Sequence, residues 1–121
     1  MDADRLQRIR EQLLQRRKDL LANYERRRAA GEEASTAEPR DEADESVRLD
    51  AQDEAWRQAE AEAREVARID AALARMREDT YGECVECGED IEEKRLIALP
   101  TASRCLSCQE GRESAASMPS L

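Results

Sequence analysis

Apolar side chains recur at helical spacing through the first quarter of the chain. From residue 4 to about residue 30 they return every three, four or seven positions, at Leu6, Ile9, Leu13, Leu20 and Tyr24. This period is typical of an amphipathic helix whose apolar stripe faces a partner. Arg16 and Asn23 stand where a strict seam would be apolar. We therefore predict a helix over about 4–30 with an imperfect helix–helix contact.

A second periodic stretch occupies about residues 46–79. Its a and d positions are apolar, apart from Glu62: Ala55, Ala59, Val66, Ile69, Leu73 and Met76. The seam ends near Thr80, and Gly82 is well placed to stop the helix. Between the two stretches, residues 31–45 are acidic and contain Gly31 and Pro39, which predicts a loop. Two helices around one loop predict an antiparallel coiled-coil hairpin over residues 1–80.

Composition excludes several classes of protein. Of the 121 residues, 40% are charged, none is Phe and one is Trp, so a globular core of ordinary size is not expected. The net charge of −9 disfavours a protein whose main partner is a phosphate backbone. No apolar run approaches the length of a transmembrane span. We expect a mainly α-helical, cytoplasmic monomer that does not enter a membrane.

All four cysteines lie in one short region. Cys84 and Cys87 form one C-x-x-C pair, Cys105 and Cys108 form another, and the chain has no histidine. Seventeen residues separate the pairs, which is the spacing of a four-cysteine zinc site. Two disulfides are disfavoured because no signal peptide opens the chain, and a redox dithiol would need a βαβ pattern. We predict one structural Zn²⁺ in a module over 81–113, then a short C-terminal helix and a flexible tail over 114–121.

The stretch from Tyr81 to Cys108 resembles the zinc-finger end of the DksA/TraR family of bacterial transcription factors. It reads Y-G-E-C-V-E-C-G-E-D-I-E-E-K-R-L-I-A-L-P-T-A-S-R-C-L-S-C. Residues 41–46, D-E-A-D-E-S, are similar to the family's tip motif D-x-x-D-x-A. The resemblance covers about residues 5–112. It implies a non-enzymatic factor that binds RNA polymerase, inserts its coiled coil into the secondary channel and alters promoter complexes with its tip.

The resemblance also assigns roles to the tip residues. Asp41 and Asp44 would be the effector carboxylates, and Ser46 replaces the family's Ala. The residues alone favour a different role, because Asp41 with Asp44 three residues later forms a fair N-terminal cap of the second helix. The two roles are compatible, because a cap also fixes the loop that presents the carboxylates.

Family members that respond strongly to the nucleotide ppGpp carry basic residues around the zinc module. Arg68 and Arg95 fit that pattern as nucleotide or polymerase contacts. Leu99 and Gln109 stand where an Arg and a Lys would be expected. Because phosphates are held by cations, the resemblance with these departures implies little dependence on ppGpp.

Two other functions fit parts of the sequence. A transcript-cleavage factor could use the tip acids to hold Mg²⁺, but the chain lacks histidine and any nucleophile–base pair. A zinc-ribbon protein could bind nucleic acid, but the region after Thr80 is itself acidic. We expect no sequence-specific DNA binding.

Overall fold

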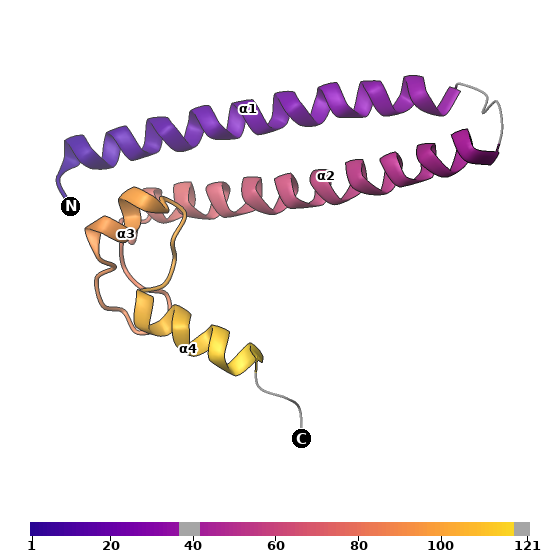
Figure 1. The fold of residues 1–121 in the computed structure, drawn as a ribbon. Helices are drawn as coiled ribbons and strands as arrows, with labels where there is room; N and C mark the ends of the chain where they lie inside the picture. Colours follow the sequence, from indigo (N-terminus) through magenta and orange to yellow (C-terminus); the bar gives the residue numbers. More distant parts are fainter. Residues whose placement is uncertain (37–41, 118–121) are drawn as a thin grey trace. The chain divides into compact units, whose positions relative to one another are not determined.

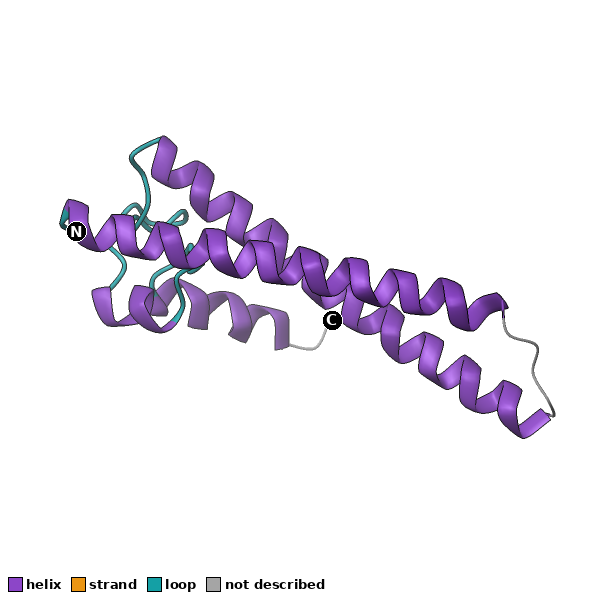
Figure 2. Ribbon diagram, turned by 90° about the horizontal axis from the view of Figure 1, so that it is seen from above, coloured by secondary structure: helices purple, strands orange, loops and turns teal. Residues whose placement is uncertain are grey.

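The computed structural model describes residues 1–36 and 42–117, except for the side chains of 34–36, 42–44 and 117. Four helices follow one another within these ranges: α1 (Ala3–Thr36), α2 (Glu42–Arg77), α3 (Glu93–Ala98) and α4 (Leu106–Ser117) (Figure 1). Figure 2 shows helices and loops, and no strand among the described residues. The predicted mainly α-helical fold is confirmed.

Packing groups the chain into two compact units. One contains residues 1–13 and 68–121, and the other contains residues 14–67. This grouping differs from the expected division at residue 80. The first turns of α1 and the last turns of α2 belong to the same unit as the zinc module. None of the described helices combines the length and apolarity that a membrane span requires.

In the unit of residues 14–67, α1 and α2 are antiparallel partners, and charged side chains cross between them. The Nε atom of Arg16 lies 2.9 Å from Oε1 of Glu65, and its Nη2 atom lies 3.2 Å from Oε2. Arg27 forms a second ion pair with Glu62. Arg16 and Glu62 are two of the polar residues that interrupt the predicted seam. They do not break the helix pair, because each has a partner of opposite charge on the facing helix.

In the unit of residues 1–13 and 68–121, the helical part has an aliphatic core. Ile9 and Leu13 of α1 are buried, as are Ile69, Ala72 and Leu73 of α2. Four of these five were predicted from periodicity, and Ala72 was not. Burying several aliphatic side chains makes the seam of this unit the main source of its helix–helix stability.

The helices are longer than predicted. Residues 31–36 and 42–45 belong to α1 and α2, so the expected loop over 31–45 is wrong at both ends, and residues 37–41 lie outside the described part. Gly31 does not end α1, because one glycine costs only about 1 kcal/mol relative to alanine. Arg28 offsets part of that cost through ion pairs with Glu25 at 3.3 Å and Glu32 at 3.5 Å.

α2 ends before Gly82, and an aspartate forms its cap. Asp79 has a φ of 59°, the left-handed conformation that usually selects glycine. The amide of Thr80 donates to the carbonyl of Arg75 over 2.9 Å, and the amide of Asp79 donates to Met76 over 3.4 Å. These bonds form a Schellman motif. Sequence analysis predicted that Gly82 stops this helix, because glycine is the residue that most often adopts the left-handed conformation.

α4 is also longer than expected. It continues to Ser117, so the flexible tail predicted over 114–121 is wrong for residues 114–117. Residues 118–121 lie outside the described part.

Candidate metal centre

The first cysteine pair lies on a tight turn that follows α2. The amide of Gly88 donates to the carbonyl of Cys84 over 2.9 Å, and the amide of Cys84 donates to Glu89 over 2.8 Å. Gly88 has a φ of 76°, a left-handed conformation that glycine adopts at no steric cost. An isolated antiparallel bridge joins Glu83 to Asp90 below the turn. These bonds fix Cys84 and Cys87 on one side of the turn.

The second pair lies where α4 begins. Cys105 precedes the helix and Cys108 is in its first turn. The amide of Cys108 donates to Sγ of Cys105 over 3.4 Å. The two pairs are tied together by the amide of Val85, which donates to the carbonyl of Ser103 over 2.9 Å. This backbone bond holds the two cysteine pairs beside each other.

The four cysteines converge as the spacing predicted. Their Sγ atoms all lie within 4.8 Å of one another. The Sγ atoms of Cys87 and Cys105 are 3.8 Å apart. A tetrahedral zinc site with Zn–S bonds of about 2.3 Å requires S–S separations of about 3.8 Å. The donor set therefore fits one zinc ion, held by four thiolates.

The acid–base properties of the cluster favour a bound cation. Backbone amide donation, first from Cys87, lowers the pKa of Cys84 to about 6. The neighbouring thiols of Cys105, Cys84 and Cys87 raise the pKa of Cys108 to about 12. One thiolate is thus stabilised by the backbone, but the cluster resists further ionisation because the negative sulfurs would repel one another. A divalent cation bound to all four sulfurs would offset their mutual repulsion and so favour ionisation of all four thiols.

A small apolar core supports the site. Cys84, Ile91, Leu96 and Ala102 are buried together, and Tyr81 packs against them. Three other apolar residues of the module lie outside this core: Ile97, Leu99 and Leu106 are 62%, 47% and 49% exposed. Within α3, Leu96 is the buried residue, so Ile97 on another face of this short helix remains in solvent. Leu99 follows α3, and Leu106 begins α4.

Tyr81 connects this core to the loop that precedes the second cysteine pair. Its hydroxyl donates to the carbonyl of Pro100 over 2.8 Å. Burial of the ring raises the pKa of the Tyr81 hydroxyl to about 12. The phenol therefore remains protonated and continues to donate at any physiological pH.

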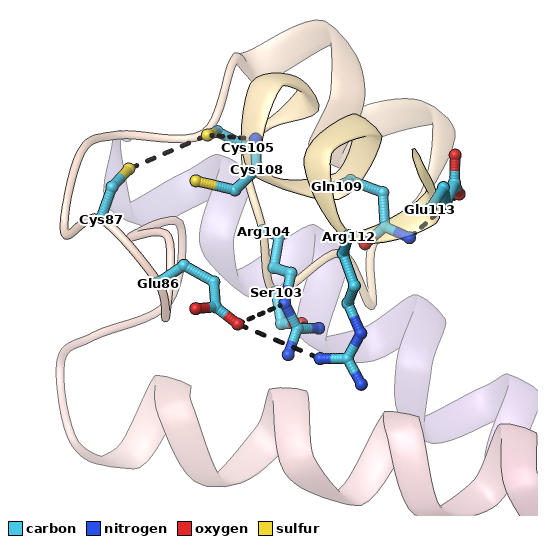
Figure 3. Close-up of polar contacts among 9 residues, drawn as sticks. All are labelled: Glu86, Cys87, Ser103, Arg104, Cys105, Cys108, Gln109, Arg112 and Glu113. Atoms are coloured by element: carbon cyan, nitrogen blue, oxygen red, sulfur yellow. Dashed lines mark hydrogen bonds and ion pairs between the residues drawn. The ribbon is translucent and has the colours of Figure 1, made fainter. Parts of the chain in front are cut away.

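Glu86, inside the first pair, contacts two arginines from the other side of the site (Figure 3). Its Oε1 atom accepts from Nε of Arg104 over 3.0 Å and lies 4.0 Å from Nη1 of Arg112. The Nε atom of Arg95 donates to the carbonyl of Arg104 over 3.0 Å. Sequence analysis named Arg95 as a contact residue, but gave no role to Glu86 or Arg112.

An open cleft of about 710 Å³ lies beside the metal centre. Arg68 and Arg95, predicted as nucleotide or polymerase contacts, both line this cleft. Leu99 and Gln109, the two uncharged departures, line it as well. The structure thus brings together four positions that are up to 41 residues apart in the sequence.

Three further arginines, Arg75, Arg104 and Arg112, line the same cleft. Arg75 is one residue that sequence analysis missed. It lies seven residues after Arg68, so the two share a face of α2, and this spacing was a usable signal. Arg112 is brought in by the path of α4, for which the sequence holds no comparable signal. Arg75 Nη2 donates to the carbonyl of Thr101 over 3.4 Å, and burial lowers the pKa of its guanidinium.

The predicted tip residues lie mostly beyond the described part. Asp41 is outside the described residues, and Asp44 is in the first turn of α2 with its side chain not described. Ser46 is an exposed residue of α2. Their roles therefore stay predictions.

Comparison with known proteins supports the zinc assignment. The prokaryotic dksA/traR C4-type zinc finger matches residues 79–114, which contain all four cysteines. The chain is 33% identical to an uncharacterised protein of Aquifex aeolicus, over 99% of this chain and 86% of that protein. It is 44% identical to the RNA polymerase-binding transcription factor DksA of Caulobacter vibrioides, over 40% of this chain and 34% of that protein.

Two solved structures are also similar. Transcription factor DksA2 from Pseudomonas aeruginosa matches with a TM-score of 0.84 and 31% identity, over 97% of this chain and 89% of that one. The RNA polymerase binding protein and transcriptional regulator Dks from Chlamydia trachomatis matches with a TM-score of 0.56 and 18% identity, over 98% and 99% of the two chains. At 18% identity, the match to the Chlamydia protein supports the fold alone. The zinc-finger match and the converging thiolates together establish a structural zinc ion.

Proposed function

Because the chain belongs to the DksA/TraR family of zinc-finger proteins, we propose that it is a transcription regulator that binds RNA polymerase directly. One observation carries the proposal. The likeness to DksA2 extends over 97% of the chain at 31% identity and therefore includes the helical pair as well as the zinc finger. The Caulobacter relative is named for polymerase binding.

The role of the metal in this function is structural. Four cysteine ligands fill the coordination shell of zinc and leave no position for water or substrate. A regulatory role, without catalysis by this chain, is consistent with that closed shell. Cleavage of transcripts would need a different centre, and the tip acids are the residues that could supply one.

We further propose that the paired helices enter the secondary channel of the polymerase and that Asp41, Asp44 and Ser46 act on promoter complexes. Two features support this. The family resemblance assigns the motif this role, and Asp44 and Ser46 fall in the first turns of α2. The exposure of Ser46 leaves it accessible to a partner.

The regulator is proposed to act with little dependence on ppGpp. Leu99 and Gln109 line the cleft beside Arg68 and Arg95, where cations would strengthen the hold on phosphates. Arg104 and Arg112 line it too, but both are engaged by Glu86. The cleft therefore offers fewer uncommitted cations than its number of arginines suggests.

We also propose that the protein acts in the cytoplasm, as a monomer, and without sequence-specific binding to DNA. The acidic net charge of −9 supports the absence of a sequence-specific DNA contact.

The test combines binding and transcription with purified components. The zinc-loaded protein should bind immobilised RNA polymerase at moderate salt, and should change the output of sensitive promoters in single-round transcription. A gel shift with random duplex DNA and a transcript-cleavage assay on stalled complexes separate the alternatives. Absence of polymerase binding would refute the proposal, and stimulated cleavage without a promoter effect would favour the cleavage factor.

A further inference from the structure

The cleft beside the metal centre collects positive charge. Five arginines line it, from α2, from α3, from the segment before α4 and from α4 itself: Arg68, Arg75, Arg95, Arg104 and Arg112. Two glutamates of α4, Glu110 and Glu113, line it as well. Five positive and two negative side chains give the lining a net charge of +3. Like charges that share one cleft repel one another, so an anion placed among them is stabilised.

Two of these arginines are held by backbone carbonyls. Nη2 of Arg75 donates to the carbonyl of Thr101 over 3.4 Å, and Nε of Arg95 donates to the carbonyl of Arg104 over 3.0 Å. A carbonyl accepts a hydrogen bond but carries no net charge. These two contacts therefore fix the positions of the guanidinium groups without reducing the positive charge of the cleft.

Glu86 supplies the carboxylate that Arg104 and Arg112 contact. It lies between Cys84 and Cys87, and Figure 3 shows the two arginine side chains pointing to the same side of the module, toward Glu86. Oε1 of Glu86 accepts from Nε of Arg104 over 3.0 Å and lies 4.0 Å from Nη1 of Arg112. Two guanidinium groups thus converge on one oxygen, which marks a position for an oxyanion.

An external anion can displace Glu86 at small cost. The strongest arginine–carboxylate pairs are bidentate, whereas Arg104 donates to Glu86 through Nε and Arg112 approaches it only to 4.0 Å. The side chains of Glu86 and Arg112 are 52% and 62% exposed, so the contact is screened by water. A phosphate group presents several oxygens and satisfies two planar guanidinium groups better than one carboxylate oxygen does.

We propose that Arg104 and Arg112 form a binding site for a diphosphate group, and that Glu86 occupies this site in the free protein as an internal competitor. Neither arginine is among the four positions that the family resemblance connects with ppGpp. The inference concerns the isolated chain, so it does not depend on the proposed binding to RNA polymerase. It gives a reason why a cleft with five arginines answers weakly to phosphates: its own carboxylate is already bound there.

The experiment titrates the zinc-loaded full chain with inorganic pyrophosphate at constant ionic strength, by isothermal calorimetry. Glu86→Gln should bind pyrophosphate about tenfold more tightly than the wild type, because a competing ion pair and the repulsion between two neighbouring anions are both removed. Glu89→Gln is the matched control. It removes the same charge from an exposed acid just beyond Cys87, and should change the affinity less than about twofold.

A second substitution in the Glu86→Gln background locates the anion. Arg112→Gln should abolish the gain in affinity, because it removes one of the two proposed ligands. Arg68→Gln should retain most of the gain, since Arg68 lines the cleft from α2 and belongs to the family's positions. A nucleoside diphosphate titrated in parallel distinguishes two sources of the group: tighter binding than pyrophosphate assigns the site to a nucleotide, and weaker binding assigns it to free pyrophosphate.

Helix content and bound zinc, measured for every variant after titration, show that the fold is intact and that pyrophosphate has not removed the metal. Equal affinity of the wild type and Glu86→Gln would overturn the inference, and so would an equal gain in Glu89→Gln, which would reflect net charge alone. A gain that survives Arg112→Gln but is lost with Arg68→Gln would also overturn it, in favour of the family's positions. Since the polymerase is absent, each of these results leaves the proposed function standing.

Discussion

Glu86 and Arg104 join the two cysteine pairs of the zinc module through a side-chain contact of 3.0 Å. Glu86 lies between Cys84 and Cys87, and Arg104 directly precedes Cys105. The pair is on the surface side of the site, since 52% of the Glu86 side chain is exposed. This ion pair adds to the metal and the backbone hydrogen bonds, which already hold the two cysteine pairs together.

Removal of this contact should have a modest effect. Glu86→Gln removes the charge and retains most of the shape, so we expect a loss of about 0.5–1 kcal/mol, the usual value for an exposed ion pair. Zinc transfer to a chelator should become about two to five times faster, by conversion of that free energy. Glu89→Gln, an exposed acid just beyond Cys87, is the matched control and should leave the rate unchanged. Equal rates for wild type and Glu86→Gln would show that the contact does not close the module.

Loss of a zinc ligand should have a much larger effect. Cys105→Ser replaces a thiolate by a weak hydroxyl ligand, and the free energy of metal binding is largely the folding free energy of such a module. We expect bound zinc to fall from one ion per chain to near zero by elemental analysis, with a loss of helix content at the zinc-module end. Ser107→Ala lies between the ligands of the same pair and should retain its zinc. Full zinc content in Cys105→Ser would contradict a four-cysteine site.

The zinc ligands were predictable because their signal is local. Each C-x-x-C pair fits a single turn, and the spacing alone identifies the metal. The helix ends were less predictable. Asp79 adopts a left-handed conformation that glycine usually adopts, and Gly31 is tolerated inside α1. Of the arginines that line the cleft, Arg68 and Arg95 were predicted, but Arg112 could not be. Arg112 reaches it through the path of α4, which hydrophobic periodicity does not specify.

Tyr81 predicts a dependence of stability on alkaline pH. Its hydroxyl donates to Pro100, and its pKa is raised from an ordinary value of about 10 to about 12. The unfolded chain therefore loses this proton first, so the contribution of Tyr81 to the free energy of unfolding is complete below pH 10 and is lost as the pH rises toward about 12. Tyr81→Phe removes the hydrogen bond and should cost about 1 kcal/mol at neutral pH.

The titration is measured by tyrosinate absorbance in Tyr24→Phe, where Tyr81 is the one remaining tyrosine. Urea denaturation of Tyr81→Phe, with Tyr24→Phe as control, gives the free energy. Half-ionisation of Tyr81 near pH 10 in the folded protein would show that its ring is not buried as described.

The tip motif predicts a separation of activity from structure. Asp44→Asn removes a carboxylate from the first turn of α2, and the loss of its interaction with the helix dipole should cost only about 0.3–1 kcal/mol. If Asp44 acts on the polymerase, the variant should lose its effect on promoter output while its helix content and polymerase affinity stay nearly unchanged. Glu45→Gln, the neighbouring exposed acid, is the control and should remain active. Full activity in Asp44→Asn would reduce Asp44 to a structural residue.

The last prediction concerns the cleft beside the metal centre. Each charge-assisted contact to a phosphate is worth on the order of 1.5–3 kcal/mol. Leu99 and Gln109 line the cleft without charge, so affinity for ppGpp should be lower by roughly a hundredfold than with two cations there. Leu99→Arg with Gln109→Lys should therefore create a response to ppGpp in promoter-specific transcription with a polymerase that lacks its other ppGpp site.

The control for this gain must add charge near the cleft but not in it. Ile97→Arg does so, because Ile97 is a 62% exposed residue of α3 that does not line the cleft. A response in the double variant but not in Ile97→Arg would assign the effect to the position of the charges. A strong response already in the wild type would contradict the prediction. It would mean that Arg104 and Arg112 release Glu86 and hold the phosphates themselves, which Arg112→Gln would then abolish.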